Sequence, residues 1–149
     1  MFYIFFDVDG VLNRESDWKS RFSIRESCVK AFAGIAHAAE KEYGVVRLVI
    51  ISTWRAGISR DGSNVSAQLK GLYAALQKEG LSVYGSTPVS DKGRQAEVEY
   101  YIRRNSVQNY LVIDDDPSLF TDPERLNMLV PDYKNGLTDK DVKIAKKLM

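Results

Sequence analysis

The sequence predicts an α/β protein with a three-layer, doubly wound (Rossmann-like) architecture and a parallel sheet of about five strands. Short apolar runs alternate with amphipathic stretches along the whole chain. Each stretch between two runs is long enough to hold a helix that crosses over the sheet. The first run is apolar at consecutive positions, which is typical of a strand buried on both faces. We therefore expect helices on both sides of the sheet.

The expected strands are five apolar runs, at residues 3–6, 45–51, 81–84, 109–113 and 126–130. The first expected helix begins in a Ser-x-x-Glu capping box formed by Ser23 and Glu26, and it ends at Gly44. Three further helices are expected from their 3.6-residue periodicity, over about 65–76, over 92–104 and from 138 onward.

The composition is that of an ordinary globular protein, and we expect one domain over residues 1–149. Of these residues 44% are apolar and 28% are charged. A chain of this length buries roughly 68–70% of its unfolded surface, so it needs neither metal nor disulfide merely to fold. The net charge of +1 predicts no global attraction to nucleic acid or to a membrane.

We expect a cytoplasmic protein with no membrane partner. The single cysteine, Cys28, cannot form an internal disulfide, which fits a reducing compartment. The longest apolar run is far too short to span a bilayer. The apolar amino terminus lacks a basic leader, so it is interpreted as a first strand and not as a signal peptide.

Polar side chains follow the expected strands at their carboxyl ends, where open parallel sheets bind ligands. They are carboxylates, two hydroxyls and a lysine: Asp7, Asp9, Ser52, Thr53, Lys92, Asp114, Asp115 and Asp116. Clustered carboxylates resist joint ionisation unless a cation neutralises them, and ligands that are all oxygen favour Mg²⁺. One carboxylate can act as a nucleophile and another as a general acid/base, while hydroxyl and ammonium groups stabilise phosphoryl oxygens. This set predicts metal-assisted phosphoryl transfer.

These residues fall into four motifs, through which the sequence resembles the haloacid dehalogenase (HAD) superfamily of phosphohydrolases. The motifs span residues 4–12, residues 49–53, Lys92, and residues 112–115. The resemblance implies that Asp7 is the nucleophile and Asp9 the general acid/base. It also implies that Lys92 neutralises the nucleophile and the phosphate.

The same resemblance implies a Mg²⁺ site formed by the Asp7 side chain, the Asp9 backbone carbonyl, and Asp114 or Asp115. Asp114 and Asp115 are favoured over Asp116 because they come first after the apolar run.

Ser52 is expected to bind the phosphoryl oxygens. It is favoured over Thr53 because it follows the strand directly, and both hydroxyls remain candidates for substrate binding. Arg55 either binds a second phosphate or pairs with a nearby carboxylate. Trp54 either packs beside the site or stacks on a base.

Arg14 and Arg94 are further candidates for substrate contact. Taken alone, Lys92 could equally be interpreted as a solvent-exposed lysine at the start of a helix, with no catalytic role.

The intervals between the motifs contain no spare domain, so we expect a capless member with an open site. Such sites suit bulky substrates. Residues 51–55, the run from Lys92 to Glu97 and the triple aspartate also resemble small HAD domains associated with RNA repair proteins.

We expect a Mg²⁺-dependent phosphatase that hydrolyses a phosphate monoester through an aspartyl-phosphate on Asp7. Its expected partner is a phosphorylated small molecule or a nucleic-acid end. The alternatives are a polynucleotide phosphatase and a non-catalytic HAD-like binding or regulatory module. The sequence predicts no oligomeric state.

Overall fold

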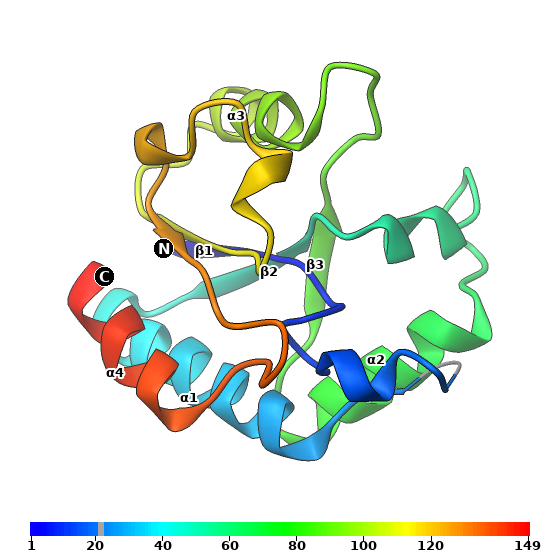
Figure 1. Cartoon of the computed structure of the whole chain (residues 1–149). Coiled ribbons are helices and arrows are strands. Elements are labelled where there is room, and N and C mark those ends of the chain that lie inside the picture. The colour runs from blue at the N-terminus through cyan, green and yellow to red at the C-terminus, as the bar shows by residue number, and fades with distance from the viewer. Residues whose placement is uncertain (21–22) are drawn as a thin grey trace.

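A computed structural model describes residues 1–20 and 23–149. Its five strands form one parallel sheet in the order β3-β2-β1-β4-β5 (Figure 1). The strands are β1 (Phe2–Phe6), β2 (Val46–Ile50), β3 (Val83–Ser86), β4 (Tyr110–Ile113) and β5 (Met128–Leu129). The chain builds β2 and β3 on one side of β1 and then returns to build β4 and β5 on the other. The connections that follow the neighbouring strands β1 and β4 therefore lead to opposite edges of the sheet. The end of these two strands is a topological switch point, where such sheets bind ligands.

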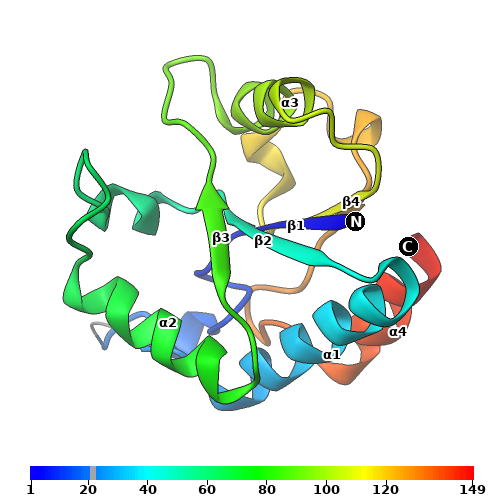
Figure 2. The same cartoon turned by 180° about the vertical axis from the view of Figure 1, so that it is seen from behind.

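Helices cover both faces of the sheet (Figure 2). α1 (Glu26–Tyr43), α2 (Ala67–Lys78) and α4 (Asp139–Leu148) lie on one face, and α3 (Arg94–Arg104) lies on the other. β1 is buried at every position, and its side chains alternate between two cores: Ile4 and Phe6 pack on the α1 side, and Tyr3 and Phe5 on the α3 side. The predicted three-layer, doubly wound fold is confirmed.

Short 3-10 helices lie in the connections that follow β1, β2 and β4. They are η1 (Glu15–Asp17), η2 (Thr53–Gly57), η3 (Pro117–Leu119) and η4 (Pro123–Arg125). Among the described residues no separate cap domain interrupts the fold, as expected. No helix in the described part of the chain is long and apolar enough to cross a membrane.

The predicted capping box at the start of α1 is wrong. The helix begins at Glu26 with Arg25 as its N-cap, and the guanidinium of Arg25 binds Asp17 with an Nη2–Oδ1 distance of 2.6 Å. The Ser23 carbonyl accepts a hydrogen bond from Asn13 Nδ2 at 3.1 Å. Tertiary contacts of the loop before α1 therefore set the start of this helix.

Candidate active site

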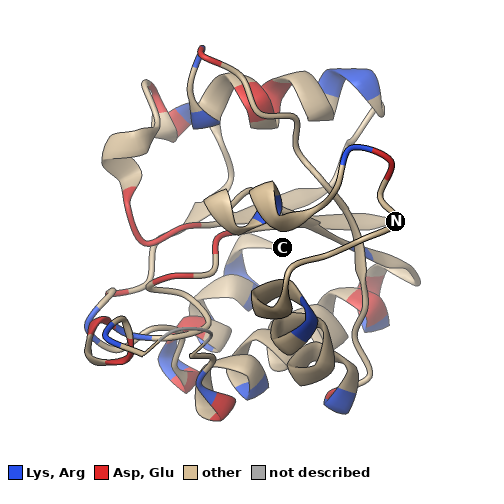
Figure 3. Cartoon of the chain, turned by 90° about the vertical axis from the view of Figure 1, so that its right-hand side faces the viewer, with Lys and Arg blue, Asp and Glu red and all other residues tan. Residues whose placement is uncertain are grey.

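Three carboxylates meet where β1 and β4 end. Asp7 directly follows β1, and Asp114 and Asp115 directly follow β4, the strand paired with β1. One oxygen from each carboxylate lies within 4.8 Å of the others. Acidic segments from separate loops gather on this side of the sheet (Figure 3). The pairing of two central strands thus brings together side chains more than a hundred positions apart in the sequence.

Burial makes these carboxylates reluctant to ionise. It raises the pKa of Asp7 to about 7. Burial and the nearby Asp7 raise the pKa of Asp114 to about 6, and burial also raises the pKa of Asp115. A cluster that is all oxygen and resists ionisation is the environment that a hard divalent cation stabilises. The residues present therefore fit Mg²⁺.

The turn after Asp9 is shaped to admit Asp115. Gly10 has φ +78°, and a Cβ at this position would lie 2.4 Å from Asp115 Oδ2. A side chain here would be strained by the backbone and would displace the carboxylate. Gly10 is therefore required by the packing of Asp115 against the backbone of the first motif.

Arg94 is the cation that contacts the cluster. It is the first residue of α3, and its Nη1 lies 2.7 Å from Asp114 Oδ2 and 3.6 Å from Asp7 Oδ2. Its side chain is 12% exposed. The sequence named Arg94 only as a candidate for substrate contact.

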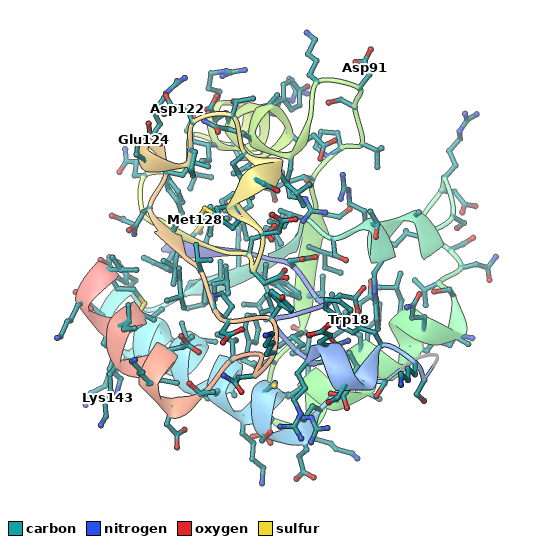
Figure 4. The ribbon with its side chains drawn as sticks, in the orientation of Figure 1. Trp18, Asp91, Asp122, Glu124, Met128 and Lys143 are labelled. Carbon is teal, nitrogen blue, oxygen red and sulfur yellow. The ribbon has the colours of Figure 1, made fainter. Side chains whose placement is uncertain are left out.

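Lys92 lies elsewhere. Its side chain is exposed in the loop between β3 and α3, and Asp91 directly before it points outward at the tip of that loop (Figure 4). Among the ion pairs and hydrogen bonds of the described residues, none joins the Lys92 side chain to Asp7. The role expected for Lys92 stays a prediction, and the structure does not bring this residue to the carboxylates.

Asp9 is oriented apart from the three clustered carboxylates. Trp54 Nε1 donates to its Oδ2 at 3.0 Å, and Asn13 Nδ2 donates to its Oδ1 at 2.9 Å. Trp54 is 7% exposed. Of the two roles left open for Trp54, the structure shows packing beside the site. These two donors therefore fix the orientation of the half-buried Asp9 carboxylate.

The hydroxyls after β2 differ in their surroundings. Ser52 is 1% exposed, and its Oγ accepts a hydrogen bond from Trp54 N at 3.1 Å, which caps η2. Thr53 is exposed. Ser52 follows β2, the strand that pairs with β1. The expected contact of Ser52 with phosphoryl oxygens stays a prediction, as does the candidacy of Thr53.

Arg55 has a set of partners within the protein. Its Nη2 lies 2.6 Å from Glu97 Oε2, with both side chains 6% exposed. Its Nη1 donates to the carbonyls of Ser52, at 2.9 Å, and Ile51. Of the two roles left open, the structure shows the pair with a carboxylate. Its expected contact with substrate stays a prediction, and in this structure Glu97 and two backbone carbonyls engage the guanidinium.

Sequence reasoning missed Asn13. This buried side chain accepts hydrogen bonds from the Gly10 backbone at 2.9 Å and from Trp18 Nε1 at 3.0 Å, and it donates to Asp9. Asn13 thus connects the first motif to η1. Its position four residues after Asp9 was visible, but an asparagine that opens a polar loop carries no signal that separates it from an ordinary turn residue.

The sheet topology and the carboxylates at the switch point agree with the resemblance to the HAD superfamily, and a family model shows the membership. The family model described as "HAD domain in Swiss Army Knife RNA repair proteins" matches residues 3–142. The chain belongs to this family, and the resemblance stated from the sequence is confirmed.

A solved structure has a similar fold. It is D,D-heptose 1.7-bisphosphate phosphatase from B. bronchiseptica, complexed with magnesium and phosphate. The TM-score is 0.61 at 17% identity, over 99% of this chain and 98% of that chain. At this identity the likeness shows the fold. A search of curated proteins found no match.

Proposed function

We propose that this protein is a Mg²⁺-dependent phosphatase that hydrolyses a phosphate monoester through an aspartyl-phosphate on Asp7. The observation that supports it best is the grouping of Asp7, Asp114 and Asp115 around Arg94, with Asp9 oriented separately. Membership of a HAD family and the likeness to a phosphatase solved with magnesium and phosphate also support it.

In the first step an Asp7 carboxylate oxygen attacks phosphorus, and the bond from phosphorus to the leaving oxygen breaks. Asp9 donates its proton to that oxygen, so the leaving group departs as an alcohol. In the second step Asp9 takes a proton from water, whose oxygen attacks phosphorus. The bond from phosphorus to Asp7 then breaks, which releases inorganic phosphate and regenerates the free carboxylate.

Arg94 and Ser52 stabilise charge on the non-bridging phosphoryl oxygens. Arg94 supplies positive charge beside Asp7, and Ser52 supplies a hydroxyl donor at the end of β2. Asp7, Asp114 or Asp115, and the Asp9 backbone carbonyl would hold Mg²⁺, which when bound would supply positive charge to neutralise the carboxylates and the phosphate.

Release of phosphate from p-nitrophenyl phosphate, measured with Mg²⁺ and with EDTA, tests the proposal. We expect Mg²⁺-dependent turnover in the wild type and none in Asp7→Asn, which is nearly isosteric but cannot attack phosphorus. Asp9→Asn retains the nucleophile but lacks the proton donor, so it separates the two roles. Unchanged turnover in Asp7→Asn would exclude the aspartyl-phosphate mechanism.

A phosphomonoester at a nucleic-acid end is the second candidate substrate. It is favoured by the matching family, which is described as a domain of RNA repair proteins. Release of phosphate from 3′- and 5′-phosphorylated oligonucleotides, compared with small sugar phosphates, tests it. Because nucleic-acid contacts displace counterions, oligonucleotide turnover should fall more steeply with salt than turnover of small phosphates.

A further inference from the structure

A pocket of about 420 Å³ opens beside the group that we propose as the proton donor. Its lining includes the Asp9 carboxylate, the indoles of Trp18 and Trp54, and the amides of Asn13 and Gln68. Asp9 is the member of the proposed catalytic set that reaches it. In the proposed reaction Asp9 protonates the oxygen of the leaving group. The leaving group would therefore lie next to this pocket.

Trp18 is presented to this pocket in a fixed orientation. It is 46% exposed, and its Nε1 donates to Asn13 Oδ1 at 3.0 Å. Its ring stacks with Tyr133 at a centroid distance of 6.1 Å and an interplanar angle of 26°. Figure 4 shows Trp18 on the segment between β1 and α1, near the centre of the view. An exposed aromatic ring that is already immobilised loses little conformational entropy when a ligand stacks on it.

Asn13 links the Trp18 ring to the Asp9 carboxylate by hydrogen bonds. The same amide accepts from Trp18 and donates to Asp9 Oδ1 at 2.9 Å. Trp54 contacts the other oxygen of Asp9 at 3.0 Å and also lines the pocket. A ligand ring on Trp18 would thus be placed relative to Asp9 through one intervening side chain.

We propose that this pocket binds the nucleobase of the nucleoside that carries the scissile phosphate, with Trp18 as its stacking platform. This inference rests on the proposed phosphatase function and names its substrate class. Aromatic faces stack on planar rings, and the amide of Gln68 can form hydrogen bonds with the edge of a base. The volume is within the usual range of roughly 300–1,000 Å³ for small-molecule sites.

The charges of the lining favour a neutral group over a second phosphate. Asp9 and Asp17 both line the pocket, and Asp17 is already paired with Arg25 at 2.6 Å. A phosphate placed beside Asp9 would be repelled by it when the carboxylate is ionised. An uncharged base meets no such repulsion.

The test compares turnover of adenosine 5′-monophosphate and 3′-monophosphate with that of ribose 5-phosphate, which lacks the base. We expect the better nucleotide to exceed ribose 5-phosphate in kcat/KM, and this preference to fall about 5- to 100-fold in Trp18→Leu, in line with the loss of one stacked base. Tyr100→Leu is the matched control, because Tyr100 is an aromatic residue 50% exposed on α3. That variant should retain the preference.

Binding of adenosine, measured by titration calorimetry, separates the two ideas because it requires no catalysis. Adenosine binding that weakens in Trp18→Leu, without turnover of any phosphate, would support the pocket and contradict the phosphatase. Equal turnover of nucleotide and ribose 5-phosphate, unaffected by Trp18→Leu, would overturn the pocket and leave the phosphatase standing. A Trp18-dependent preference for ribose 5-phosphate would also overturn it, in favour of a sugar-binding surface.

Discussion

At the scale of single residues, the positive charge beside the proposed nucleophile, Asp7, differs from what the sequence led us to expect. Lys92 lies in the loop before α3 and Arg94 is the first residue of α3, and of the two only Arg94 contacts Asp7 and Asp114. The local sequence cannot decide between them, because the path of the loop before α3 and the placement of the helix determine which side chain reaches the carboxylates. The helix is held on the sheet by a buried cluster in which Val98 of α3 joins apolar residues of β1, β2 and β4.

Replacing Arg94 should therefore impair turnover more than replacing Lys92. We expect Arg94→Ala to lower kcat by roughly 10²–10³, as loss of one preorganised charge stabiliser does elsewhere. The sequence alone predicted that loss for Lys92→Ala, which serves as the matched comparison. Steady-state kinetics on p-nitrophenyl phosphate measure both. A larger loss in Lys92→Ala would return the role to the lysine.

Ionisation of Asp7 should make the metal-free protein less stable as the pH rises. The pKa of Asp7 is about 7 in the folded state against 3.8 for an ordinary aspartate, so between these values the folded state binds more protons than the unfolded state. The free energy of unfolding then falls as the pH rises from about 4 to about 7. We expect Asp7→Asn to reduce this fall, by an amount on the order of 1–3 kcal/mol.

Urea denaturation in EDTA at pH 5 and at pH 8 measures this difference. Asp91→Asn is a suitable control, since Asp91 is exposed at a loop tip. It should behave as the wild type does. An equal loss of stability in Asp7→Asn and in the wild type would show that Asp7 is not the group responsible.

At the scale of elements, one buried ion pair attaches the end of β2 to α3. Arg55 belongs to η2 and Glu97 to α3, and Glu97 Oε1 also accepts a hydrogen bond from Ser90 N at 2.8 Å. Arg55 in turn donates to the Ser52 carbonyl. The pair therefore positions the residue that we expect to contact the phosphate, although Arg55 itself is occupied.

Breaking this pair should destabilise the fold strongly. We expect Glu97→Gln to cost about 3–5 kcal/mol, because it leaves the Arg55 guanidinium buried without its counter-charge. The control is Glu26→Gln, which removes an exposed pair with Lys30 and should cost no more than about 0.5 kcal/mol. Urea midpoints measure both. Similar midpoints for the two variants would show that the buried pair carries little stability.

The element order could be predicted from the sequence, but some boundaries could not. Consecutive apolar residues identified β1 and β2, since strands buried on both faces need them. β3 begins at Val83 and not at Leu81, because the Leu81 amide instead donates to the Leu76 carbonyl at the end of α2. β5 is limited to Met128–Leu129, two residues at the edge of the sheet.

The acidic side of the site could be predicted for a similar reason. Asp7, Asp114 and Asp115 directly follow buried strands, so the strand pairing alone brings them together. The contacts of Asn13 and Trp18 belong to an irregular loop, whose conformation depends on long-range hydrogen bonds such as Glu15 N to Tyr133 O. No local pattern encodes such contacts.

At the scale of the whole molecule, the proposed metal site joins the two halves of the sheet. Asp7 extends from β1, which belongs to the half built first, and Asp114 and Asp115 extend from β4, which begins the half built after α3. A cation bound by all three would bind the folded state and not the unfolded chain, in which these residues are far apart. Its binding should therefore raise the stability of the entire fold.

We expect Mg²⁺ to raise the Tm of the wild type at pH 8, and to raise it less at pH 5.5. At the lower pH Asp7 and Asp114 are largely protonated, because their pKa values are about 7 and about 6, and protons then compete with the metal. At a free concentration of 100 times Kd the stabilisation amounts to about 2.7 kcal/mol. Differential scanning calorimetry with Mg²⁺ and with EDTA measures it, and Asp114→Asn should show a smaller shift at pH 8. A shift that is equal at both pH values and in both proteins would place Mg²⁺ at some other site, because the raised pKa values of Asp7 and Asp114 tie binding at the proposed site to this pH range.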